Sequence, residues 1–169
     1  MIERCHDDGT TRSVAQYSDC LTYRYALTRQ WDAVAPRLAW VMLNPSTADE
    51  RRNDPTIERC ARRTRMLGFG GFRVVNLFAF RARDPTAVKR APAPVGPDSD
   101  AALTRAAAWA DVILCGWGCH GLHLQRGAAV EMLLRQTSRP LMHLGMTAGG
   151  APRHPLYLPY ARQPEPWLA

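Results

Sequence analysis

Short apolar segments alternate along this chain with longer stretches in which apolar residues recur at helical spacing. Apolar runs of four to nine residues are typical of strands that are covered on both faces of a sheet. An earlier segment, residues 20–27, instead alternates between apolar and polar positions, which predicts an amphipathic strand at a sheet edge. The four mainly apolar segments are residues 38–43, 72–80, 112–116 and 140–144.

The stretches between these segments predict helices. Residues 55–67 are the clearest case, because Asp54 is a good N-cap residue, Pro55 suits the first helical turn and Gly68 can end the helix. Two further helices are expected at residues 98–109 and 122–136. Residues 81–97 are rich in proline and are expected to form a loop.

Strands that alternate with helices indicate an α/β protein with a parallel sheet covered on both faces. We expect a three-layer α/β/α sandwich around a central, four-stranded, mainly parallel sheet. At 169 residues the chain is long enough for one domain with one core. We therefore expect residues 1–169 to form a single domain, with peripheral tails at residues 1–16 and 159–169.

Composition points to a protein that works in the cytoplasm. The five cysteines are odd in number and scattered, as expected for reduced thiols. No apolar stretch approaches the roughly 20 residues of a membrane-spanning helix, so we expect no membrane partner. The first eight residues, MIERCHDD, lack the apolar core of a signal peptide.

The charge of the chain permits a polyanionic partner. The formal net charge is +7 and the sequence pI is about 9.6, almost entirely from arginine, since Lys89 is the only lysine. Basic domains attract nucleic acids whatever their detailed surface. Nucleic acid, DNA rather than RNA, or a nucleotide is the partner that we expect. The sequence predicts no particular oligomeric state.

Polar residues follow the apolar segments at the points where parallel strands would end. Asn44 comes directly after the first segment, Asn76 interrupts the second, and Trp117 follows the third. His154 follows a glycine-rich loop after the fourth. Because the carboxyl ends of parallel strands meet at one edge of a sheet, where α/β proteins bind ligands, these residues predict a shared site.

The chemistry of these residues suits recognition of a nucleobase. The amide of Asn76 carries a donor and an acceptor that can read a pyrimidine edge, or it can cap the strand end. Asn44 can hold a water molecule or brace its own turn. His154 can donate a hydrogen bond to an oxygen that becomes negative, or be an ordinary surface histidine. Phe78 and Trp117 can stack on a base or belong to the core.

Other residues of the same segments can bind phosphate or move a proton. The hydroxyls of Ser46 and Thr47, beside Pro45, and the guanidinium of Arg153 can contact a phosphate. Asp54 is expected to cap its helix first, and it is also the best available general base.

A metal site is not expected. Cys115, Cys119, His120 and His123 lie at short spacings that zinc sites use. However, Cys115 lies within an expected strand, and no second set of paired ligands occurs elsewhere. We expect neither a metal nor a cofactor.

Several strings resemble those of a bacterial and phage family of unassigned function. They span about residues 17–158 and include MLNPSTAD at 42–49, NDPTI at 53–57, GGFRVVNLFA at 70–79 and PRHPLYL at 152–158. This resemblance implies a family and no activity.

The chain is also distantly similar to the uracil-DNA glycosylase superfamily of α/β/α sandwiches. The pairs Asn44-Pro45 and His154-Pro155 and the strand-ending Asn76 resemble its motifs, and Gly116-Trp117-Gly118 resembles a further one. The resemblance implies that Asn76 reads the base, Asn44 positions a water molecule and His154 stabilises the departing base. Many active members of the superfamily have an aspartate at the position of Asn44. A serine often follows the His-Pro pair in that superfamily, at the position of Leu156 here.

Three functional hypotheses follow. The first is a glycosylase-like protein that binds, and in its catalytic form excises, a base of DNA or RNA after flipping it out of the stack. The second is an enzyme that acts on free nucleosides or nucleotides in the same pocket. The third is a base-binding module without catalysis.

Overall fold

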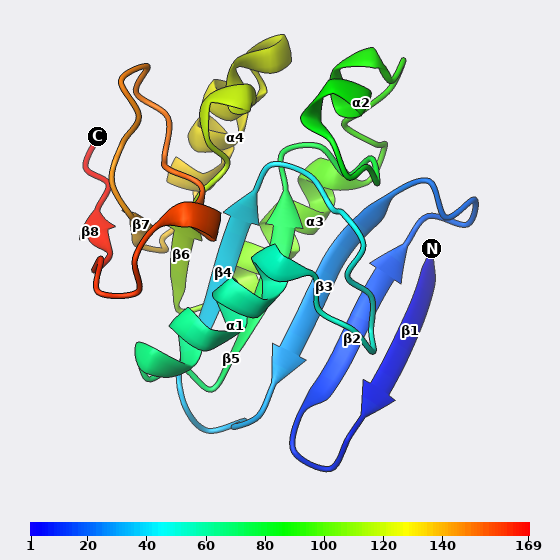
Figure 1. The fold of residues 1–169 in the computed structure, drawn as a ribbon, viewed down its shortest axis with the longest axis vertical. Coiled ribbons are helices and arrows are strands. Elements are labelled where there is room, and N and C mark those ends of the chain that lie inside the picture. Colours follow the sequence, from blue (N-terminus) through cyan, green and yellow to red (C-terminus); the bar gives the residue numbers. More distant parts are fainter.

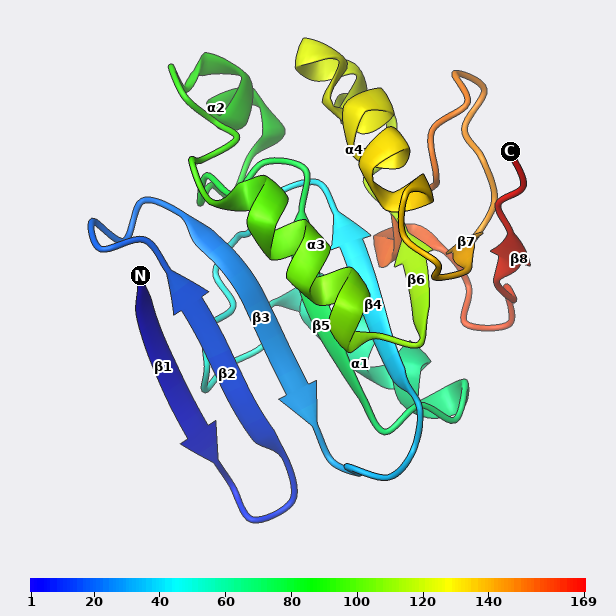
Figure 2. The same ribbon diagram turned by 180° about the vertical axis from the view of Figure 1, so that it is seen from behind.

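The computed structural model describes all 169 residues as one mixed sheet with helices on both faces. In Figure 1, α1 (Pro55–Met66) lies in front of the sheet, and in Figure 2 α3 (Ser99–Trp109) and α4 (Arg126–Arg135) lie in front of the opposite face. The sheet has eight strands, in the order β1-β2-β3-β5-β4-β6-β7-β8. These are β1 (Ile2–Asp7), β2 (Arg12–Tyr17), β3 (Arg24–Gln30), β4 (Arg37–Met42), β5 (Gly71–Asn76), β6 (Val112–Cys115), β7 (Leu141–His143) and β8 (Glu165–Pro166).

The α/β class was predicted correctly, but the sheet is larger and more mixed than the expected four-stranded, mainly parallel one. The four expected strands are present as β5, β4, β6 and β7, and each is parallel to its neighbour in this group. Four other pairings are antiparallel, so antiparallel pairs outnumber the three parallel ones. The added strands come from the two ends of the chain.

Residues 1–16, expected as a peripheral tail, instead form β1 and most of β2. β1 is largely exposed, so it lacks the apolar pattern from which buried strands are recognised. Residues 159–169 also pack on the sheet, since β8 pairs with β7 and the backbone N–H of Trp167 donates to Leu141.

The segment expected as an edge strand lies inside the sheet. β3 begins at Arg24, pairs with both β2 and β5, and is buried over most of its length. A bulge interrupts its pairing with β2, because Gln16 opposes Ala26 whereas Tyr17 opposes Arg24. Tyr25 is therefore the extra residue.

The core has two main parts, one on each face of the sheet. On the α1 face, Trp40 and Phe72 pack against Ile57 of the helix. On the other face, Val41 and Val75 pack under α3 and α4 with the apolar residues of those helices. Strands buried on both faces need apolar residues at nearly every position, which is why these segments read as continuous apolar runs.

The helices begin where the local sequence can cap them. Asp54 accepts a hydrogen bond of 2.9 Å from the N–H of Ile57 and begins α1, as predicted. Asp84 caps α2 (Pro85–Arg90) in the same way, inside the proline-rich segment that was expected to be a loop. The expected helix 122–136 is divided into a 3-10 segment, η1 (Cys119–Gln125), and α4, because Leu124 adopts a non-helical, left-handed backbone conformation.

No helix has the length and the apolar character that crossing a membrane requires.

Candidate active site

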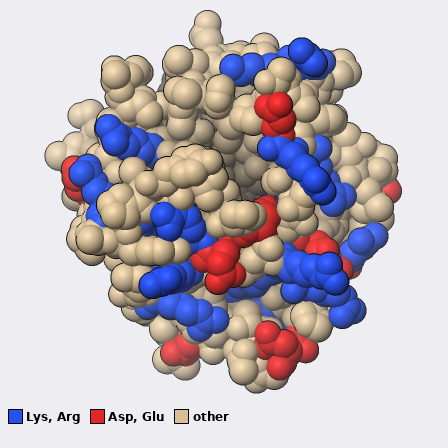
Figure 3. Space-filling model, viewed as in Figure 1, with Lys and Arg blue, Asp and Glu red and all other residues tan.

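One large pocket opens at the carboxyl ends of β4, β5 and β6. Its volume is about 770 Å³, within the range of sites that enclose small ligands. Figure 3 shows a hollow near the centre of the face that carries α1, with arginine or lysine groups on several sides and fewer acidic groups. We call it the strand-end pocket. It contains Asn44, Asn76 and His154 in one cavity, as predicted from their positions after the apolar segments.

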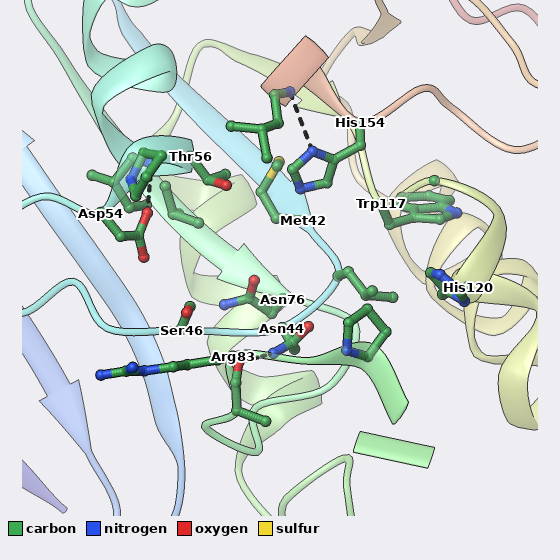
Figure 4. A pocket seen from close by; sticks show the side chains of 18 of the residues that line it. Met42, Asn44, Ser46, Asp54, Thr56, Asn76, Arg83, Trp117, His120 and His154 are labelled. Atoms are coloured by element: carbon green, nitrogen blue, oxygen red, sulfur yellow. Dashed lines mark hydrogen bonds between the residues drawn. The ribbon is translucent and has the colours of Figure 1, made fainter. Parts of the chain in front are cut away.

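Asn76 is the last residue of β5, and its side chain lies in the middle of the pocket (Figure 4). It is 3% exposed, and neither its Nδ2 nor its Oδ1 has a hydrogen-bond partner in the protein. Leaving one buried polar atom without a partner costs about 1–3 kcal/mol. The amide therefore does not serve to cap the strand end, which was the alternative interpretation of this residue.

Asn44 lies just beyond β4, and one half of its amide braces the loop. Its Nδ2 donates to the carbonyl oxygens of Pro45, at 3.0 Å, and Ala82, at 2.7 Å. The Oδ1 atom accepts no hydrogen bond from the protein, so the same side chain both fixes its turn and keeps an acceptor for a ligand or a water molecule.

His154 is a neutral hydrogen-bond donor in this pocket. Its Nδ1 accepts a hydrogen bond of 3.2 Å from the N–H of Leu156, at the start of η2 (Pro155–Tyr157). Burial lowers the pKa of His154 to about 4, against a smaller opposing effect of Asp54. A neutral imidazole whose Nδ1 accepts carries its proton on Nε2. Figure 4 shows the ring directed from its loop towards Met42 and Asn76.

Two glycines after β6 allow the His154 loop to approach the sheet. A Cβ atom on Gly116 would lie 3.2 Å from Cδ of Pro155 and 3.3 Å from the carbonyl oxygen of Arg153. Gly118 has a φ of +73°, and its N–H donates to the carbonyl of Pro152 at 2.8 Å. The Gly-Trp-Gly sequence thus positions His154 although the two segments are far apart in the chain.

Asp54 lines the pocket but is engaged as a structural cap. Besides Ile57, it accepts a hydrogen bond of 3.2 Å from the N–H of Ala48. Both carboxylate oxygens are therefore used by backbone groups, which supports the interpretation of Asp54 as a cap and leaves it poorly placed as a general base.

The other predicted residues divide into two groups. Ser46, Thr47 and Trp117 line the pocket. Three others do not: Pro45 is buried in the loop, Phe78 lies in the core with its ring 5.6 Å from that of His123, and Arg153 donates from Nε to the carbonyl of Met146.

Sequence reasoning missed the buried cation of the pocket, Arg24. This side chain is 2% exposed and lines the cavity beside Asp54. Leu27 packs on the α1 face of the sheet. In a regular strand Arg24, three residues earlier, would point to the other face. The bulge returns it to the face of α1, as bulges commonly redirect side chains near functional sites. No signal in the sequence marks the bulge.

Two further lining groups, Arg83 and His120, come from segments whose local structure was not foreseen. Arg83 immediately precedes the cap of α2, and His120 belongs to η1. The Asp84-Pro85 pair repeats the Asp54-Pro55 pattern and is the signal that could have revealed α2. No cluster of three or more histidine, cysteine, aspartate or glutamate side chains is arranged to hold a metal ion.

Comparison with known proteins identifies a family without assigning an activity. A family model described as "Protein of unknown function (DUF1643)" matches residues 24–156. The matched range contains every residue that lines the strand-end pocket except Tyr157. No curated protein and no solved structure matches the chain.

Proposed function

The chain belongs to the DUF1643 family, and we propose that its strand-end pocket binds a nucleobase of DNA or RNA and hydrolyses the N-glycosidic bond that holds it. The proposal gives Asn76, His154 and Asn44 separate roles in one reaction. It also includes the finer fold relationship, a uracil-DNA glycosylase-like sandwich, in which β5, β4, β6 and β7 correspond to the four parallel strands.

The observation that carries the proposal is the unpartnered amide of Asn76. A buried donor and acceptor on one planar group are matched by the lactam edge of a pyrimidine or oxopurine, which offers an N–H beside a carbonyl oxygen. Such a ligand would replace both missing hydrogen bonds at once. A ligand with only one polar atom would leave the other half of the amide unpaired.

His154 has the protonation state that a departing base requires. At neutral pH its Nε2–H can donate to a base oxygen, and this bond strengthens as negative charge develops on the base. Because the imidazole stays neutral, it stabilises the anion without transferring its proton.

The chemical step that we propose is a hydrolysis. The bond between the sugar C1′ and the base nitrogen breaks, and its electron pair leaves with the base. A water molecule held by Oδ1 of Asn44 attacks C1′ and releases its proton to solvent. The flipping of the base out of a strand costs a few kcal/mol, least for an already unpaired base.

Charge supports a polymeric substrate. The chain has a net charge of +7, and Figure 3 shows basic groups on several sides of the hollow, together with fewer acidic ones. Basic groups near the mouth of the pocket attract a phosphate backbone, so that one base of the strand can enter.

The test is a panel of single- and double-stranded oligonucleotides, each with one uracil, hypoxanthine, xanthine or oxidised pyrimidine. Abasic sites would be detected by alkaline strand cleavage, and binding by fluorescence anisotropy. The proposal expects cleavage at one class of lactam base by the wild type, its loss in Asn76→Ala, and its retention in His6→Ala, whose histidine lies on β1 far from the pocket. Binding without cleavage would instead support the non-catalytic module. The absence of both binding and cleavage would contradict the glycosylase and the base-binding module alike.

A further inference from the structure

We propose that Arg24 forms an anion subsite in the strand-end pocket and that the ligand is therefore a nucleoside phosphate, held at its base by Asn76 and at its phosphate by Arg24. This inference rests on the proposed function for the base end of the ligand. It adds a second recognition element, at a residue whose side chain the sequence did not connect with the site.

The hydrogen bonding of Arg24 leaves one edge of its guanidinium open. Nη1 donates to the carbonyl oxygen of Ala48, whereas Nε is buried without a partner and Nη2 forms no hydrogen bond with the protein. Nε and Nη2 are the two nitrogens that together bind an oxyanion in a bidentate manner. The open edge therefore has the geometry of a phosphate receptor.

No protein carboxylate pairs with this cation. Arg24 forms no ion pair within 4.0 Å, although its 2% exposure makes an unpaired charge costly. Burial lowers the pKa of Arg24 to about 10, and Asp54 is the group that opposes this effect most. Both oxygens of Asp54 are held by the N–H groups of Ile57 and Ala48. Asp54 helps to keep Arg24 charged without closing its open edge.

Neighbouring lining groups can complete the subsite. The side-chain hydroxyls of Ser46 and Thr47 make no hydrogen bond with the protein, and both residues line the pocket. The N–H of Ala82 donates to the carbonyl of Pro45 at 3.0 Å, which holds Arg83 beside this loop. Figure 4 shows the Arg83 side chain extending alongside Ser46. Two hydroxyls and a second guanidinium thus line the same pocket as Arg24.

The other arginine on this strand shows what a structural role looks like. Arg29 is also buried, and its Nη1 likewise lacks a partner, but its Nε and Nη2 edge is occupied. This edge donates to the side-chain oxygen of Asn53 and to the carbonyls of Asp49 and Arg52, and so holds residues 49–53 against the sheet. Arg24 makes a single such bond. The difference supports a binding function for Arg24.

The volume of about 770 Å³ also exceeds what a base alone would fill, and it falls within the range of sites that enclose a whole drug-sized ligand. The phosphate can belong to a free mononucleotide or to the backbone of a flipped-out residue. The chemistry at Arg24 is the same in both cases, so the experiment has to separate the two sources.

Calorimetric titration of the wild type provides the first test. The probes are the deoxynucleosides, their 5′- and 3′-monophosphates, inorganic phosphate, and a trinucleotide with the same central base. We expect a phosphate to strengthen binding roughly 10- to 100-fold over the nucleoside, the range of a charge-assisted bidentate contact. The gain appears with the monophosphate if the source is a free nucleotide, and only with the trinucleotide if it is a phosphodiester.

Variants then assign the gain to Arg24. Arg24→Gln should abolish the gain in affinity that the phosphate provides, and leave the affinity for the nucleoside within about threefold of the wild type. Arg24→Lys should retain only part of this gain, since lysine lacks the paired donors of a guanidinium. Arg73→Gln is the matched control, because Arg73 is a partly buried arginine on β5 that bonds to Thr28 outside this pocket. Thermal unfolding of each variant shows whether it is folded.

The outcomes separate this inference from the proposed function. Equal affinity for nucleoside and phosphorylated forms in the wild type overturns the subsite and leaves base binding standing. Phosphate binding that depends on Arg24 without any nucleoside binding supports the subsite and overturns the proposed base recognition. Absence of binding by every probe overturns both, and this comparison needs no variant.

Discussion

Asn76 lies directly opposite Met42 in the parallel pair of β4 and β5, and this register directs its amide into the strand-end pocket. Its neighbour Val75 points the other way and packs into the core under α3 and α4. Since side chains alternate between the faces of a sheet, a shift of one residue would bury the amide under the helices and expose an apolar side chain to the pocket.

The first prediction concerns the stability cost of Asn76. Replacing Asn76 by the similarly sized leucine removes two unpartnered buried polar atoms, so Asn76→Leu should raise the free energy of unfolding by about 1–2 kcal/mol. The same change should abolish base binding. Denaturant unfolding and anisotropy on one oligonucleotide measure the two effects.

Thr64→Val is the control for this prediction. Thr64 is fully buried, but its hydroxyl accepts from Nε1 of Trp40 at 3.0 Å and donates to the carbonyl of Cys60. Removing a satisfied group should destabilise the protein by about 1–3 kcal/mol. A loss of stability in Asn76→Leu as large as that in Thr64→Val would show that the amide is a structural element.

The second prediction concerns catalysis by His154. If the pocket cleaves a glycosidic bond, His154→Ala should lower single-turnover rates by about 100- to 1000-fold and leave oligonucleotide binding nearly intact, because its hydrogen bond strengthens as charge builds on the departing base. Rates and filter-binding affinities on one duplex separate the two effects. His154→Asn retains a side chain that can accept from the N–H of Leu156, so full activity in this variant would assign His154 to loop structure alone.

The third prediction is a pH dependence of stability. The pKa of His154 falls from 6.5 in its ordinary state to about 4 in the folded protein, so the unfolded chain binds more protons between these values. Protonation therefore favours unfolding, and the free energy of unfolding should fall as the pH drops from about 6.5 to 4, by at most about 1.4 kcal/mol per pH unit. Denaturant titrations of wild type and His154→Asn give this contribution as a difference, because the carboxylates titrate in both. If the free energies of unfolding of the two proteins changed in parallel with pH, the prediction would be contradicted.

The fourth prediction concerns Arg63, which holds the chain that follows η2. This buried arginine donates to four backbone carbonyls between residues 158 and 162, the shortest bond being 2.7 Å to Arg162. Arg63→Met should destabilise the protein by about 3 kcal/mol or more, because it leaves these acceptors without a partner. Trypsin should then cleave after Arg162 faster than in the wild type.

Arg62→Met is its matched control. Arg62 is exposed and lies 4.4 Å from the ring centre of Tyr160, so its loss should cost no more than about 1 kcal/mol. Equal tryptic cleavage of the Arg62 and Arg63 variants would mean that stacking on Tyr160, and not the carbonyl bonds, retains this segment.

Local sequence determined the parts of this protein whose physics is local. The apolar runs predicted the four parallel strands because each is buried on both faces, and Asp54 with Pro55 predicted the start of α1 because a cap depends on neighbouring residues. The placement of Asn44, Asn76 and His154 in one pocket also followed, since parallel strands bring their carboxyl ends to one edge.

Only the tertiary structure decided the remainder. β1 is mostly exposed and gains its place by pairing with β2, which no apolar pattern records. The bulge at Tyr25 depends on the register between two strands, and it alone turns Arg24 towards the pocket. The orphaned amide of Asn76 likewise depends on what surrounds it in space, because a residue type defines which hydrogen bonds are possible and the packed fold decides which are made.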